Sequence, residues 1–349
     1  MKLCLNTSFR QFAPSTWDMN RNPGKLAVFY SLLAPEALIS LLLPNYELGT
    51  IKSCEFWHRG LSDIYLVNIQ DKLYILRVSH HHWRSESEIA FELQLLTFLH
   101  EHQIPVAYPL KTKEDELFLA INAPEGKRYA ALFPYAPGTV ALGDLDVSQS
   151  HLLGETLAQL HQVGQEFACP VKRQPLNLNY LLDDSLATIA PFLADSRPEL
   201  AELLETARAI KHQLQDLPIQ RPYWGICWGD PHSGNVHFTP DNRLTLFDFD
   251  QCGYGWRSFD IAKFGQVCLQ TGLSHQVRAA FLSGYQAIAE LTSWEIECLP
   301  ALTQVAHLWA WAISLSTAQH YDYSRLDRHY FRQRLEHLKC LKSHDCAIF

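Results

Sequence analysis

Two clusters of polar residues, separated by a short apolar hairpin, constrain this chain more than any other feature of its sequence. The first cluster is Trp-Gly-Asp-Pro-His-Ser-Gly-Asn at 228–235, and the second is Phe-Asp-Phe-Asp at 247–250. Apolar residues at 236–238 and 244–247 predict two short strands, with a Pro-Asp-Asn turn between them. Such a hairpin brings polar side chains from both clusters to one end of the strands.

The side chains brought together in this way are Asp230, Asn235 and Asp248. Two carboxylates and an amide oxygen suit a hard cation such as Mg²⁺, which takes few protein oxygens together with phosphate. A carboxylate that stays off the metal can accept or orient the proton of an attacking hydroxyl, so the set fits phosphoryl transfer. The alternative is that these residues are ordinary turn formers. The second Asp at a suitable distance, flanked by apolar strands, favours the functional interpretation.

The length of 349 residues exceeds that of a usual single core and predicts two lobes. Residues 1–45 are a lead-in that ends in a helix, 46–136 form a β-rich lobe, and 137–349 are mostly helical. In the β-rich lobe, an antiparallel meander precedes one helix at 85–102, with a capping box of Ser85 and Glu88. The strands predicted there are 51–57, 64–69, 73–78, 106–110 and 116–121, and the lead-in helix is predicted at 27–43.

Composition excludes several classes of protein. A net charge of −8 argues against a dedicated binder of nucleic acid or of an anionic membrane, which needs a basic field. Nine cysteines without a C-x-x-C pair predict a reduced, cytoplasmic protein. No apolar stretch reaches the ~20 residues that span a bilayer, so no membrane partner is expected. The sequence does not indicate an oligomeric state.

The polar clusters resemble the motifs of the aminoglycoside phosphotransferase family, which includes choline kinase and type II homoserine kinase. Its catalytic loop, roughly H-G-D-x-H-x-x-N, stands here as Trp228-Gly-Asp-Pro-His-Ser-Gly-Asn, and its metal motif, roughly I-D-F-D/G, as Phe247-Asp-Phe-Asp. The resemblance covers about residues 50–265. It implies an α+β, two-lobed protein-kinase-like fold, with a β-rich N-lobe that carries one helix and an α-rich C-lobe.

The resemblance also implies roles for the clustered residues. Asp230 resembles the catalytic base that receives or orients the substrate hydroxyl, while Asn235 and Asp248 resemble the metal ligands. Three further residues are expected in support. His232 would shape the loop, and Asp260 would buttress the catalytic loop or only favour its helix N-terminus. Asp250 would be a carboxylate that supports the metal ligands from behind, or a solvated turn acid.

In the β-rich lobe, Arg77 stands where a phosphate-binding lysine is usual, with Glu92 as its expected partner and Glu88 as second choice. The phosphate-covering loop would use backbone groups near Gly60 and Ser62. The adenine slot would lie at the joint between the lobes, at Leu132–Tyr135, which includes Phe133 and Tyr135. A further departure is Trp228, which replaces the usual histidine before Gly-Asp.

We therefore expect an ATP- and Mg²⁺-dependent kinase that phosphorylates a hydroxyl of a small molecule, such as an aminoglycoside, an amino alcohol or a homoserine-like acceptor. The acidic net charge favours a cationic or neutral acceptor over an anionic one. One alternative is a Ser/Thr protein kinase of the stress-response type. Another is a nucleotide-binding pseudokinase, which Arg77 and the single-glycine loop would favour. A metal-dependent hydrolase fits the spacing less well.

Overall fold

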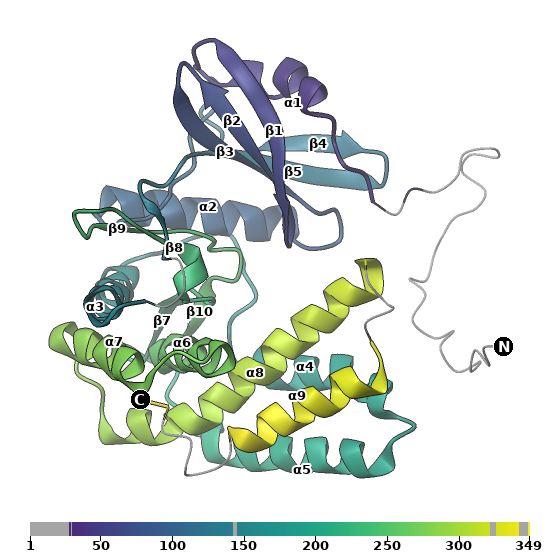
Figure 1. The fold of residues 1–349 in the computed structure, drawn as a ribbon, viewed down its shortest axis with the longest axis vertical. Helices are drawn as coiled ribbons and strands as arrows, with labels where there is room; N and C mark the ends of the chain where they lie inside the picture. Colours follow the sequence, from purple (N-terminus) through teal and green to yellow (C-terminus); the bar gives the residue numbers. More distant parts are fainter. Residues whose placement is uncertain (1–27, 29, 142–144, 322–325, 342–347) are drawn as a thin grey trace, which may run out of the picture.

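The computed structural model describes residues 28, 30–141, 145–321, 326–341 and 348–349. Figure 1 shows a β-rich lobe above a larger helical lobe. Most of the lead-in at 1–45 lies outside the described residues. The helix predicted at 27–43 is shorter, because α1 (Pro35–Leu41) starts at a proline and is followed by a 3₁₀ turn, η2 (Leu43–Asn45). The lobe boundaries at 46 and 136 remain predictions.

The β-rich lobe is one antiparallel sheet of five strands in the order β1-β2-β3-β5-β4. The predicted meander is confirmed, but the strand at 106–110 is wrong, since Val106 makes only an isolated bridge to Leu246. The edge strand β4 begins later than the segment predicted for it, and β5 was not predicted at all. The bounds are β1 (Ile51–Arg59), β2 (Ser62–Ile69), β3 (Lys72–Ser79), β4 (Leu119–Ala123) and β5 (Gly126–Pro134).

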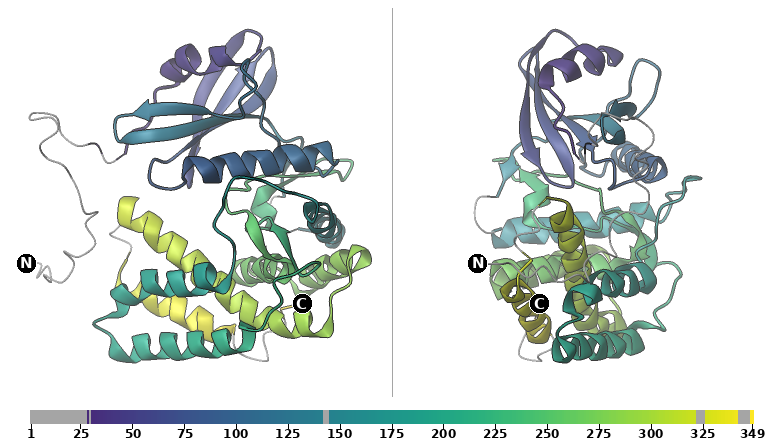
Figure 2. Two further views of the ribbon diagram at one scale, coloured as in Figure 1. Left: turned by 180° about the vertical axis from the view of Figure 1, so that it is seen from behind. Right: turned by 90° about the vertical axis from the view of Figure 1, so that its right-hand side faces the viewer.

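The helix α2 (Glu86–Glu101) lies between this sheet and the helical lobe (Figures 1 and 2). The predicted capping box is present, since the Ser85 hydroxyl accepts from the Glu88 N–H and the Glu88 carboxylate accepts from the Ser85 N–H. The buried apolar side chains of α2 belong to the large core of the helical lobe, whereas α1 and the other face of the sheet form a separate small core. The two lobes are therefore packed together through α2.

The helical lobe carries the polar clusters on and beside two small sheets, which helices surround. The predicted hairpin is confirmed as β8 (Val236–Phe238) and β9 (Leu244–Leu246), and β6 (Thr139–Val140) pairs with β8. A second small sheet pairs β7 (Trp224–Cys227) with β10 (Gly253–Trp256). The helical segments are α3 (Val147–Gly164), η3 (Asn179–Asp183), α4 (Asp184–Ile189), η4 (Ala190–Leu193), α5 (Arg197–Leu214), α6 (Arg257–Thr271), α7 (His275–Ile288), α8 (Ser293–Tyr321) and α9 (Arg328–Cys340).

Two helices of this lobe, α3 and α7, cross at close range, and a third, α8, is largely buried. A Cβ on Gly154 of α3 would lie 2.1 Å from the Phe281 carbonyl of α7, and one on Gly284 would lie 2.0 Å from the His151 carbonyl, so both glycines permit a close helix crossing. The helix α8 is long and apolar enough to pass for a membrane span over Ser293–Ala318, but 78% of that window is buried inside the protein. This burial is the property of a central core helix.

Candidate active site

Asp260 holds the backbone of the first polar cluster. It is fully buried, and its carboxylate accepts hydrogen bonds from the backbone N–H groups of Trp228, at 2.7 Å, and Gly229, at 2.8 Å. The His161 ring lies 3.0 Å from the same carboxylate. Gly229 has φ +88°, and a Cβ there would meet the Gln251 carbonyl at 2.1 Å. A glycine at this position and a buried carboxylate behind it therefore set the shape of the loop.

Trp228 links the two polar clusters to each other. Its indole Nε1–H donates to the Asp248 carbonyl at 3.1 Å, and its ring stacks on Phe249, with centroids 5.4 Å apart. Asp248 itself has φ +57°, a left-handed conformation that costs a non-glycine residue free energy and is concentrated at functional sites. Trp228, which stands where the family usually has a histidine, thus connects the loop to the second cluster through a hydrogen bond and a ring contact.

Asp230 is surrounded by groups that favour its ionised form. Lys263 Nζ lies 3.2 Å from Asp230 Oδ1, and His232 Nε2 lies 3.5 Å from Oδ2. Asn235 donates its amide to the Asp230 carbonyl at 3.1 Å. Burial alone would raise the pKa of Asp230, but the Lys263 ammonium and the His232 ring outweigh it and hold the pKa below its usual range. Asp230 is therefore a carboxylate suited to orienting a hydroxyl more than to removing its proton early.

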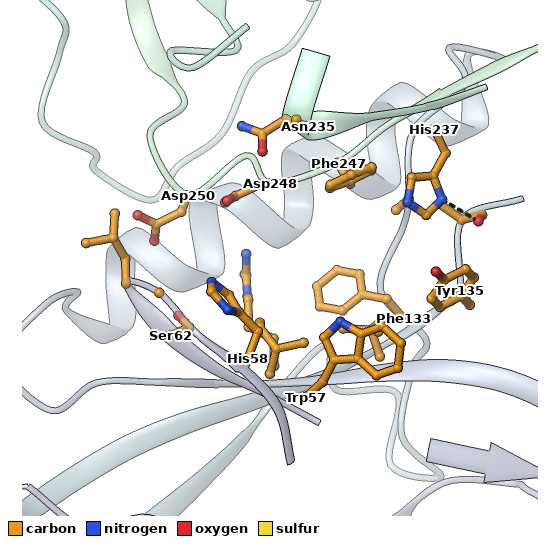
Figure 3. Close-up of a pocket in the computed structure, with 18 of the residues that line it drawn as sticks. Trp57, His58, Ser62, Phe133, Tyr135, Asn235, His237, Phe247, Asp248 and Asp250 are labelled. Atoms are coloured by element: carbon orange, nitrogen blue, oxygen red, sulfur yellow. Dashed lines mark hydrogen bonds between the residues drawn. The ribbon is translucent and has the colours of Figure 1, made fainter. Parts of the chain in front are cut away.

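His232 forms a hydrogen bond within the loop, because its Nδ1 accepts from the Gly234 N–H at 3.0 Å. This bond caps the short helix η5 (Ser233–Asn235), from which Asn235 projects. Figure 3 shows the Asn235 amide oxygen pointing towards Asp248. Desolvation by the surrounding walls of the cleft, followed by repulsion from Asp250, raises the pKa of Asp248 to about 7. The Asn235 amide oxygen and the Asp248 carboxylate, which lies near a second carboxylate, form a set of oxygen ligands that fits Mg²⁺.

Asp250 is a buried anchor between the lobes, and not a solvated turn acid. Arg84, immediately before α2, contacts its two oxygens at 3.1 and 3.2 Å, and the Trp83 indole N–H donates to it at 2.6 Å. Despite burial, the neighbouring guanidinium of Arg84 lowers the pKa of Asp250. The Asp250 carboxylate is therefore already paired with Arg84 and Trp83 of the N-lobe.

Arg77 and Glu92 form a bidentate pair between β3 and α2. The two guanidinium-to-carboxylate distances are 2.6 and 2.8 Å, and Glu92 is fully buried. This is the arrangement expected from the sequence, with Glu92 as the partner; Glu88 pairs instead with Arg84 at 3.3 Å. Arginine can hold this pair and still present a cation to phosphate, because its guanidinium has donors on several edges.

A cavity of about 450 Å³ lies between the lobes. Figure 3 shows Ser62 of the N-lobe across this space from Asn235 and Asp248. Gly60, Arg77 and Glu92 line it as well, and Phe133 and Tyr135 line the part at the joint. His237 donates to the Ala136 carbonyl at 2.8 Å and so fixes the joint to the hairpin. The residues expected at the nucleotide site therefore share one cavity, while Asp230 is not among those that line it.

Sequence reasoning missed several residues of the site. We did not expect the hydrogen bond from Trp228 to Asp248. The contacts of Trp83 and Arg84 with Asp250, and the position of Lys263, were not expected either. Only Lys263 carried a readable signal, since it follows Asp260 by three residues on a predicted helix and so shares its face. The others depend on contacts between residues far apart in the chain.

The chain is similar to known proteins over most of its length. Residues 54–296 match the family described as "Phosphotransferase enzyme family". An uncharacterized protein of Synechocystis sp. is 58% identical over 92% of this chain and 89% of its own length. A homoserine kinase of Granulibacter bethesdensis is 26% identical over 80% of this chain and 85% of its own.

Solved structures share the fold. An amicoumacin kinase in complex with AMP-PNP, Ca²⁺ and Ami superposes with a TM-score of 0.71 at 21% identity, over 88% of this chain and 93% of that one. A microcompartment-associated aminopropanol kinase gives a TM-score of 0.71 at 18% identity, over 88% and 95% of the two chains. The expected two-lobed kinase-like fold is thus confirmed.

Proposed function

Because the chain belongs to the phosphotransferase enzyme family, we propose that it is an ATP- and Mg²⁺-dependent kinase that phosphorylates a hydroxyl of a small molecule. The observation that carries the proposal is the meeting of Asp230, Asn235 and Asp248 beside a cavity that also contains the Arg77–Glu92 pair. The names of the homoserine kinase relatives and of the kinases of similar fold support a small hydroxyl acceptor.

The joint between the lobes favours an adenine base. Tyr135 N–H donates to the Leu73 carbonyl, so the neighbouring pair of Tyr74 and Pro134 is a non-hydrogen-bonded pair of the ladder. The Pro134 carbonyl therefore faces away from β3, and the Ala136 N–H has no backbone acceptor within the described residues. One free acceptor and one free donor match the amino group and ring nitrogen of adenine, whereas guanine presents the reverse pattern.

Each residue of the site then has a separate proposed role. Arg77 would hold phosphate oxygens, Asn235 and Asp248 would hold Mg²⁺, and Asp230 would accept a hydrogen bond from the acceptor hydroxyl. When bound with the nucleotide, Mg²⁺ supplies charge neutralisation at the phosphates. Asp260 and Trp228 fix the loop that carries Asp230, so that the hydroxyl is held in line before transfer.

The test is ADP release from Mg²⁺-ATP with a panel of amino alcohols, aminoglycosides and homoserine. The variants Asp230→Asn and Asp248→Ala should each lower turnover by roughly 10³-fold or more, about 4 kcal/mol of transition-state stabilisation. The exposed Asp241→Asn variant is the matched control and should keep full turnover. Turnover that survives both site variants would reject the proposal.

The two alternatives give other outcomes in the same assay. A pseudokinase would bind nucleotide in the presence of Mg²⁺, but it would not release ADP with any of the acceptors. A protein kinase would ignore the small molecules and transfer phosphate to Ser or Thr of a protein, including itself. The bidentate Arg77–Glu92 pair, with distances of 2.6 and 2.8 Å, favours an active enzyme over the pseudokinase.

A further inference from the structure

A buried ammonium group contacts the proposed catalytic carboxylate from outside the nucleotide cavity. Lys263 lies on α6 one turn after Asp260, its side chain is 6% exposed, and its Nζ lies 3.2 Å from Asp230 Oδ1. Asn235 and Asp248 line the cavity between the lobes, but neither Asp230 nor Lys263 does. The Lys263–Asp230 contact therefore lies outside the lining of the cavity to which Asn235 and Asp248 belong.

The Lys263 ammonium is incompletely satisfied. It has three N–H donors, and its partners within the described part of the chain are Asp230 and the Gln266 side-chain oxygen, the latter at 3.5 Å. Both contacts are longer than the about 2.7–2.9 Å of a good charge-assisted bond. A buried cation is costly unless its donors are well paired. This ammonium is thus poised to gain from another anionic oxygen.

Within the part of the helical lobe that the structure describes, no other buried carboxylate is left unpaired for that purpose. The buried carboxylates of the helical lobe that the structure describes are already paired: Asp250 with Arg84, Asp260 with the loop backbone and Glu295 with Arg257. His307, whose pKa the charge of Lys263 helps to lower, is kept neutral mainly by burial, which brings that pKa to about 4. Any ligand that reaches Asp230 from this side therefore meets a positive charge.

We propose that the acceptor carries a carboxylate close to the hydroxyl that it presents to Asp230, and that Lys263 is the specificity-determining residue that binds this carboxylate. The inference rests on the proposed function and names the acceptor class of the same site. It replaces the expectation of a cationic or neutral acceptor drawn from net charge. Net charge sums the whole surface, whereas the acceptor interacts with the few charges around Asp230.

The test compares three short acceptors with Mg²⁺-ATP: 4-hydroxybutyrate, which has only a carboxylate, 3-amino-1-propanol, which has only an ammonium group, and L-homoserine, which has both. We expect kcat/KM for the two carboxylates to exceed that for the amino alcohol by roughly 10- to 100-fold, the worth of one hydrogen bond to a charged group. The variant Lys263→Gln should abolish this preference through KM, and Lys263→Arg should restore most of it.

The ratio between acceptors decides the matter, because any effect of the variant on Asp230 applies to all three and cancels. A uniform fall in kcat with the preference intact would overturn the inference and place the ammonium on the transferred phosphoryl group. Phosphorylation of the amino alcohol alone would overturn it while leaving the proposed function standing.

A binding measurement covers the case in which none of the three is phosphorylated. With Mg²⁺ and AMP-PNP present, 4-hydroxybutyrate should raise the melting temperature of the wild-type chain but not of Lys263→Gln. Such a rise supports the inference even if the proposed reaction fails. Without turnover and without this rise, the inference is overturned. The melting temperature of each variant without ligands checks that it is folded.

Discussion

Asp260 shows how much a single buried carboxylate can contribute to the shape of a loop. It accepts two backbone hydrogen bonds from the segment before Asp230 and one from His161, and it has no contact with solvent. An asparagine in its place has one oxygen fewer and presents an N–H₂ group to backbone donors. One or more N–H groups would then be buried without an acceptor.

We therefore predict that Asp260→Asn lowers the free energy of unfolding by on the order of 2–3 kcal/mol. Urea unfolding followed by fluorescence measures this change. The control is Asp241→Asn, at an exposed turn in the hairpin between the two clusters, which should change stability by less than about 0.5 kcal/mol. Equal stability of Asp260→Asn and the control would mean that the carboxylate does not hold the loop.

At this scale, the sequence predicted residue identities better than their partners. Asp230, Asn235 and Asp248 could be named because their spacing in a short hairpin brings them together without any knowledge of the rest of the fold. The environment of Asp250 could not be predicted, because its partner Arg84 lies 166 residues away in the chain and in the other lobe. Local spacing carries no information about such a contact.

At the scale of the elements, the Arg77–Glu92 pair connects β3 with α2, and its contribution to the free energy of unfolding can be predicted. Glu92 is fully buried and its guanidinium partner is 12% exposed, so removal of one partner leaves an uncompensated charge in the interior. A buried pair as a whole adds little stability, but breaking it is costly. The pair should therefore show strong coupling between its two substitutions.

We predict that Arg77→Met lowers the free energy of unfolding by about 3–5 kcal/mol, and that the double variant Arg77→Met/Glu92→Leu regains most of that loss. A double-mutant cycle by denaturant unfolding measures the coupling. Simple additivity of the two single effects would contradict it. The double variant should nevertheless bind AMP-PNP more weakly than the wild type, because the phosphate-binding cation is gone.

The elements themselves were predicted best where the pattern is local. The capping box fixed the start of α2, and alternating apolar residues located β1, β2 and β3. The strand β5 was missed because its residues are largely buried and show little alternation, and its pairing with β3 is what defines it. Val106 was placed in a strand on apolar character, although it forms only an isolated bridge with β9.

At the scale of the whole molecule, the two lobes meet along α2 and along the anchors of Asp250. The large core takes in the buried face of α2, while Trp83 and Arg84 fasten the metal motif to the N-lobe. The cavity is thus bounded by two parts that are connected through buried contacts, and Arg77, Asn235 and Asp248 all line it. We therefore propose that nucleotide binding requires a divalent cation.

Calorimetric titration of AMP-PNP tests this requirement most directly. The wild-type chain should bind AMP-PNP at least about tenfold more tightly with Mg²⁺ than with EDTA, a difference of ~1.4 kcal/mol. Asp248→Asn should lose this dependence on Mg²⁺ while it remains folded by its melting temperature. Equal affinity of the wild-type chain with Mg²⁺ and with EDTA, or an unchanged Mg²⁺ dependence in Asp248→Asn, would contradict the account.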